Sequence, residues 1–173
     1  MQPPQFPVGP EVAEAPPSAQ RREQLIAILE NAPAALEKAL AGLSEAQLNT
    51  LYKNWTIRQI AHHLPDSHAN AYIRFKLALT EDQPTIKPYK EDRWVALEDS
   101  RAGDVQALLA LMAGVHACWV QLLRSMSDAD FARTYFHPES NATVRLDAAL
   151  VDYAWHCRHH TGQILWLREQ NGW

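Results

Sequence analysis

Two short clusters hold six of the eight histidines in this chain, and their spacing indicates a metal site. The later cluster spans residues 156–160 and reads HCRHH. Because a helix turns every 3.6 residues, His156 and His160 lie on one face about one turn apart, and their rings can converge on one ion. The earlier cluster spans residues 62–68 (HHLPDSH) and can supply a third ligand from another helix.

A buried histidine is more often a hydrogen-bonded core residue than a ligand, so the pair needs a closer argument. Two neutral rings packed four residues apart would compete for the same polar partners unless a cation lies between them. The pair therefore favours a metal. It is not the helical metalloprotease motif, because no glutamate follows His156. Cys157 is expected to pack in the core, since adjacent helical positions diverge by about 100°.

The other histidines have less distinctive surroundings. His62 is expected on the opposite side of its helix, in solvent, and His159 is expected to be exposed. His68 falls at the centre of an apolar helix face, either as a core residue or as a group that contacts a ligand. His116 and His137 are isolated in the sequence, and an ordinary structural role is favoured for both.

Three further polar residues are candidates to support the site or to bind substrate. Asp152 lies one turn before His156 and can accept the free N–H of that ring, although an exposed acid is an equal alternative. Asn70 and Arg74 lie on the same polar stripe as His63, bordering an apolar face. Arg74 can bind a carboxylate through two parallel hydrogen bonds, and a surface salt bridge is the equal alternative.

Helical periodicity organises most of the chain. Four long amphipathic helices without convincing strands predict an all-α four-helix bundle, in which facing helices can build a metal site. Pro33 and Pro65 fall inside two of these helices, and each removes a backbone hydrogen bond. We expect a kink or short break at Pro33 and a bend at Pro65. The helices are expected at about residues 18–42, 56–79, 104–126 and 146–169.

The remaining segments are an arm and two connections. Residues 1–17 contain six prolines, which predicts an extended N-terminal arm and leaves residues 18–173 as one bundle domain. Residues 81–102 form a long connection with a helical turn near Trp94. Residues 132–144 alternate weakly and indicate a hairpin-like excursion.

Composition limits the expected cellular location of the protein and the classes of partner that it can bind. The net charge is -4 and the chain has no basic run, so nucleic acid is not an expected partner. It has no apolar run near the roughly 20 residues of a membrane span, and no secretion signal at its start. The two cysteines are far apart, which favours reduced thiols. We therefore expect a cytoplasmic protein.

Several stretches resemble the YfiT-like branch of the DinB superfamily. They are residues 55–59 (WTIRQ), 62–76 (HHLPDSHANAYIRFK), 135–138 (YFHP) and 153–160 (YAWHCRHH). The resemblance implies a four-helix bundle, commonly a homodimer, with a divalent metal ion on three histidines. It assigns the ligands to His63, His156 and His160. Gln163 departs from the close relatives, which carry a histidine there.

Three neutral imidazoles leave a divalent ion its full charge and an open position, as in catalytic zinc sites. Such an ion can activate water for hydrolysis or deprotonate a bound thiol. The resemblance accordingly implies a metal-dependent hydrolase, or a transferase that adds a low-molecular-weight thiol such as bacillithiol to an electrophile. The missing glutamate base favours thiol transfer.

Zinc is the expected metal, and nickel is the alternative. The expected partners are a small thiol and an electrophile, or a hydrolysable substrate. Asn70 and Arg74 are the candidate contacts for a thiol substrate. The alternative from a different class is a non-catalytic, metal-stabilised dimeric binding module of the stress response.

Overall fold

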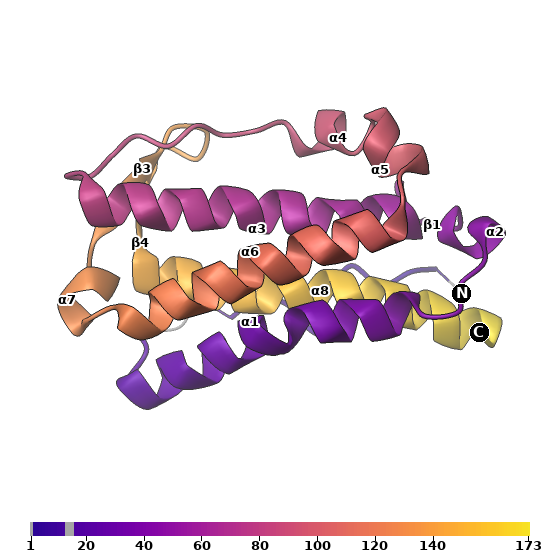
Figure 1. The fold of residues 1–173 in the computed structure, drawn as a ribbon, viewed down its shortest axis with the longest axis horizontal. Coiled ribbons are helices and arrows are strands. Elements are labelled where there is room, and N and C mark those ends of the chain that lie inside the picture. Colours follow the sequence, from indigo (N-terminus) through magenta and orange to yellow (C-terminus); the bar gives the residue numbers. More distant parts are fainter. Residues whose placement is uncertain (1, 13–15) are drawn as a thin grey trace.

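Four long helices carry the fold of the computed structural model, which describes residues 2–12 and 16–173 (Figure 1). The predicted four-helix bundle is confirmed, and the helix boundaries lie close to those expected from the sequence. Polar residues begin three of the helices: the side chains of Ser18, Thr56 and Asp104 each accept a backbone N–H of the first turn. The helices are α1 (Ala19–Leu40), α3 (Ile57–Thr80), α6 (Val105–Ser125) and α8 (Leu146–Asn171).

The four helices form a square in which each packs against two neighbours. Helix α1 contacts α8 and α6, and α3 contacts the same two helices from the other side. The rings of Phe75 and Trp119, both buried, meet edge to face at the centre with centroids 5.3 Å apart. Burying each such side chain contributes about 1.5–3 kcal/mol. The apolar faces therefore fix which sides of α3 and α8 point inward.

Helix α6 is the one helix in the described residues that is long and apolar enough to cross a membrane, judged by length and composition alone. In this structure it forms one side of the bundle and buries Met112, His116 and Trp119 against α1 and α3. These buried side chains contribute to the core, and 28% of the most apolar stretch of the helix is buried.

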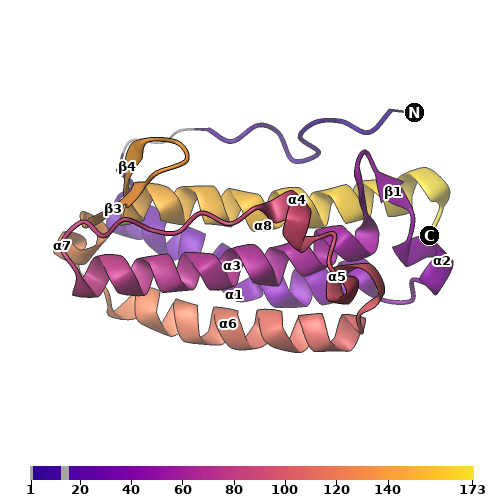
Figure 2. The ribbon, with the colours of Figure 1, turned by 90° about the horizontal axis from the view of Figure 1, so that it is seen from above.

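Short elements connect the long helices. The 81–102 connection runs beside α3 and contains two short helices, one of them at the expected turn near Trp94 (Figure 2). The expected hairpin is present, with Thr134 paired to Arg145. A second hairpin before α3 was not expected from the sequence. The short elements are α2 (Glu45–Leu48), β1 (Leu51–Tyr52), β2 (Trp55–Thr56), α4 (Glu91–Trp94), α5 (Glu98–Ala102), α7 (Asp128–Phe131), β3 (Thr134–His137) and β4 (Ala142–Arg145).

Both internal prolines are accommodated within continuous helices. Helix α1 runs through Pro33 and α3 runs through Pro65 without ending. Of the kink or short break expected at Pro33, the continuous helix excludes only the break. Each proline still leaves the carbonyl four residues before it without its usual helical donor.

The N-terminal arm lies along the outer side of α8 (Figure 2). The indole N–H of Trp155 donates to the Gly9 carbonyl at 3.0 Å, and the Tyr52 hydroxyl donates to the Pro4 carbonyl at 2.5 Å. A Cβ on Gly162 would come within 2.8 Å of the Val8 side chain, so a glycine allows this close approach. Within the predicted arm, residues 1 and 13–15 lie outside the described part of the chain.

Candidate metal centre

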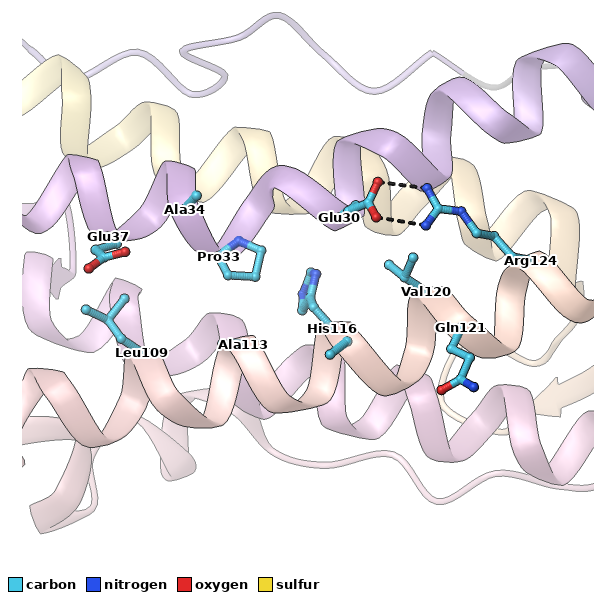
Figure 3. Close-up of a pocket in the computed structure, with 11 residues that line it drawn as sticks. Glu30, Pro33, Ala34, Glu37, Leu109, Ala113, His116, Val120, Gln121 and Arg124 are labelled. Atoms are coloured by element: carbon cyan, nitrogen blue, oxygen red, sulfur yellow. Dashed lines mark hydrogen bonds and ion pairs between the residues drawn. The ribbon is translucent and has the colours of Figure 1, made fainter.

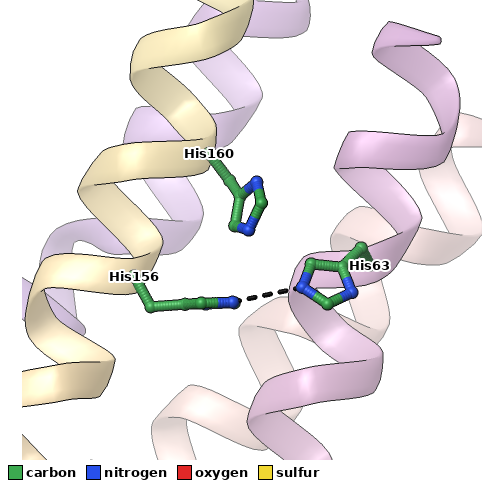
Figure 4. A group of neighbouring side chains, drawn as sticks. All are labelled: His63, His156 and His160. Carbon is green, nitrogen blue, oxygen red and sulfur yellow. Dashed lines mark hydrogen bonds between the residues drawn. The ribbon is translucent and has the colours of Figure 1, made fainter. Parts of the chain in front are cut away.

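The structure brings three histidines from two helices to one point (Figure 4). His63 comes from α3, and His156 and His160 come from successive turns of α8. Ring nitrogens of the three side chains all lie within 4.8 Å of one another. The Nε2 atoms of His63 and His156 are 3.1 Å apart, close to the roughly 3.3 Å between two nitrogens on one tetrahedral ion. The spacing therefore fits a single metal ion.

Hydrogen bonds at the far side of two rings turn their Nε2 atoms toward this point. The His160 Nδ1–H donates to Oε1 of Gln163 at 2.9 Å, and Gln163 Nε2 lies 3.0 Å from Nε2 of His159. Nδ1 of His156 lies 3.2 Å from Nε2 of His68. Nδ1 of His63 is buried and has no partner. Two of the three rings are thus oriented by polar neighbours, as metal-bound imidazoles generally are.

Burial keeps the three rings in the unprotonated form that binds metals. Loss of hydration lowers the pKa of His63 to about 4 and that of His160 to about 3. The pKa of His156 falls well below its usual value for the same reason, with the neighbouring histidines adding to the effect. All three rings are therefore neutral at pH 7, and each has one unprotonated nitrogen, the form of imidazole that binds metal ions.

The comparisons with known proteins agree with this geometry. Residues 28–164 match the sequence profile of the DinB superfamily. The chain belongs to the DinB superfamily. A Bacillus subtilis (strain 168) member named "Putative metal-dependent hydrolase YfiT" is 41% identical over 170 residues, covering 97% of this chain and 96% of that protein.

Other relatives support the same assignment. A Bacillus mycoides (strain KBAB4) protein, also named a putative metal-dependent hydrolase, is 49% identical over 147 residues, or 84% of each chain. The solved structure described as "YfiT from Bacillus subtilis is a probable metal-dependent hydrolase with an unusual four-helix bundle topology" superimposes with a TM-score of 0.94. It has 40% identity and covers 97% of both chains. The DinB fold thus extends over nearly the whole sequence.

A cavity of about 640 Å³ opens beside His156, and we call it the metal cleft. Arg74 lies in its wall and donates from Nη1 to the Tyr153 hydroxyl at 3.0 Å, while its Nε is buried without a partner. Burial raises the pKa of Asp152 to about 6, with a smaller contribution from the charge of Glu11. The cleft is lined by Ser67, Arg74, Pro88, Tyr89, Lys90, Glu91, Asp92, Arg93, His137, Glu139, Asp152, Tyr153 and His156.

Of the two candidate substrate contacts, Arg74 and Asn70, only Arg74 lies at the metal cleft. Arg74 lines the metal cleft, and no salt-bridge partner is found for it within the part of the chain that the structure describes. Asn70 is not among the residues that line the metal cleft, and its side chain donates to the Asp66 carbonyl of its own helix at 2.8 Å. The polar stripe on α3 therefore reaches the metal cleft at Arg74 but not at Asn70.

Among the histidines outside the candidate ligand set, two differ from expectation. His159 is only 7% exposed, because Trp155 stacks on it at 4.6 Å and Phe6 of the arm lies 5.9 Å away. His62 is half-buried against the 81–102 connection, and burial lowers its pKa. The expectations of exposure for both were wrong, since each is covered by a segment distant in sequence.

The partner of His156 also differs from the candidate proposed from the sequence. Asp152 lies in the cleft wall, whereas Nδ1 of His156 lies within hydrogen-bonding distance of His68. The expectation that His68 is either a core residue or a group that contacts a ligand is thus met in both respects, since His68 is also fully buried. His116, isolated in the sequence, is only 1% exposed and lies 2.9 Å from His68. An apolar helix such as α6 rarely buries a histidine without a polar partner, and that was the available signal.

Proposed function

We propose that this protein is a metal-dependent hydrolase whose ion is held by Nε2 of His63, His156 and His160. The observation that carries the proposal is the convergence of three neutral imidazoles, one of which, His156, lines a cleft of about 640 Å³. The names of its DinB relatives support the same activity. A divalent ion on three imidazoles keeps an open position and lowers the pKa of bound water to about 7. Zinc is the proposed metal and nickel the alternative.

The residues of the metal cleft supply the groups that hydrolysis needs besides the metal. Asp152, with a pKa of about 6, is mostly ionised at pH 7 and can accept a proton and return it to a leaving group. Arg74 lines the same cleft and has no salt-bridge partner among the described residues, so its guanidinium can hold a carboxylate of the substrate. We therefore propose an anionic ester or amide as the substrate class. No sequence motif marks Asp152 as a general base, and its position one turn before His156 had indicated only a possible hydrogen bond to that ring.

Thiol transfer is the second candidate, and Cys157 bears on it. This thiol is buried and its pKa is raised to about 12 by burial, so it is not the nucleophile. A thiol would have to arrive as a substrate, with its sulfur on the ion and a carboxylate on Arg74. The cleft beside His156 has room for such a molecule.

Metal analysis combined with an activity screen tests the proposal. Protein purified without chelator should contain about one zinc or nickel ion per chain, and His160→Ala should contain none. Anionic esters and amides should be hydrolysed by the wild type only, and a thiol with an electrophile forms the parallel screen. A chelator that lowers Tm while both screens are negative would instead support the non-catalytic binding module. The homodimer stays a prediction, which sedimentation analysis of the loaded protein tests.

A further inference from the structure

A line of three histidines, two of them fully buried, connects the metal centre to helix α1, which supplies none of the three proposed ligands. From His156, the line passes to His68 on α3 at 3.2 Å and then to Nε2 of His116 on α6 at 2.9 Å. Nδ1 of His116 lies 2.5 Å from the carbonyl oxygen of Leu29 on α1. His68 is 0% exposed and His116 is 1% exposed, so water does not compete for these contacts.

The carbonyl at the end of the line fixes the direction of every hydrogen bond in it. A carbonyl oxygen can only accept, so Nδ1 of His116 carries its hydrogen and donates to Leu29. The Nε2 of that neutral ring must then accept from Nδ1–H of His68. By the same reasoning, Nε2 of His68 accepts from Nδ1–H of His156. The His156 Nε2 is left without a hydrogen, and this is the atom that faces His63.

The Leu29 carbonyl is available because Pro33 follows four residues later. In a regular helix the amide of residue 33 would donate to the carbonyl of residue 29, but proline has no N–H. Helix α1 nevertheless continues through this point. Pro33 and His116 face each other across a cavity of about 710 Å³ between α1 and α6 (Figure 3). The acceptor that orients the whole line is thus created by a proline inside the helix.

We propose that His68, His116 and Pro33 are positioning residues that hold His156 in the tautomer whose Nε2 is free to bind the metal. The role of the ion in this inference rests on the proposed function. The order of the hydrogen bonds does not, because it follows from the Leu29 carbonyl and the contacts between the three neutral rings. Removing a partner of this kind from a ligating histidine typically weakens metal binding by about 10- to 100-fold.

The test measures the His156 tautomer and the zinc dissociation constant in the full-length protein. The tautomer is read from ¹⁵N shifts of chelator-treated protein, and the dissociation constant from competition with a chromophoric chelator. His116→Phe removes the donor and the acceptor. It should leave His156 as a mixture of tautomers and raise the zinc Kd by about 10- to 100-fold. His116→Gln keeps an amide N–H and a carbonyl, and should bind zinc more tightly than His116→Phe.

Pro33→Ala separates helix stability from the orientation of His156. It returns an N–H to the Leu29 carbonyl and removes a proline from a helix interior, which ordinarily favours the helix. We expect a Tm at or above that of the wild type, together with a weaker zinc Kd. Ser18→Ala is the matched control, because it removes the N-cap of α1 and should lower Tm while leaving the Kd unchanged.

Two outcomes would overturn the inference. One is a folded His116→Phe protein in which His156 keeps its tautomer and zinc binds as in the wild type. If that variant does not fold, a Pro33→Ala protein with the wild-type His156 tautomer and the wild-type zinc Kd would also overturn the inference. A wild type that takes up no zinc would refute the proposed function alone, because the tautomer is measured without metal.

Discussion

Acid should destabilise the metal-free protein through its buried histidines. The pKa of His63 allows the change in the free energy of unfolding to be calculated for one of them. Its pKa is about 4 in the folded protein and about 6.5 in an unfolded chain. The unfolded state therefore binds more protons between these values, and stability rises with pH across that window. The contribution is complete above pH 6.5 and is lost as the pH falls toward 4. At pH 5 the loss amounts to about 2 kcal/mol for this one ring.

A comparison with a variant isolates this contribution from those of other groups. His160, with a pKa of about 3, adds to the acid effect, although the two rings interact and their contributions do not simply add. Asp66 and Asp152 act in the opposite direction, because burial raises the pKa of each to about 6. His63→Gln removes only the titrating ring and keeps a polar side chain.

Urea unfolding of chelator-treated protein at pH 7.5 and pH 5 is the assay. The wild type should lose about 2 kcal/mol more free energy of unfolding than His63→Gln on this change of pH. If the two proteins lose the same amount, the ring at position 63 is not held neutral by burial. The argument that the site is ready for a cation would then fail. Zinc should reduce the loss in the wild type, because an ion on the rings excludes protons.

Three further predictions concern the ligands, the cleft and the arm. Zinc at about 1,000 times its Kd should stabilise the wild type by about 4 kcal/mol, and His160→Ala should show no zinc-dependent rise in Tm. Arg74→Gln should raise KM for an anionic substrate about tenfold or more, and an equal effect on a neutral analogue of that substrate would contradict the assigned contact. Gly162→Ala should push Val8 and the arm away from α8, since the added Cβ comes within 2.8 Å. Limited proteolysis should cut that arm faster than in the wild type, and an unchanged rate would count against the packing described.

Local rules made the backbone and part of the site predictable from the sequence. The caps at Ser18 and Thr56 mark helix starts, because their side chains satisfy the first free amides of a helix. His156 and His160 share a face because a helix repeats every 3.6 residues. The family resemblance added His63 from a second helix. The helix caps and the shared face depend on residues close in sequence, and the third ligand depends on a family motif. All of them can be predicted without knowing how the helices pack.

Contacts between distant segments decided the surroundings of the ligands. His68 and His116 lie 48 residues apart and meet because α3 packs on α6, which no local pattern of either helix specifies. His159 is buried because the arm crosses α8 at Phe6, 153 positions earlier in the chain.

The sequence by itself therefore determined four amphipathic helices and a pair of histidines able to share an ion. The tertiary structure decided which rings and carboxyls surround that pair. The physical reason is that helical periodicity sets the direction of a side chain around its own axis. The identity of the facing residue depends on how whole apolar surfaces pack together.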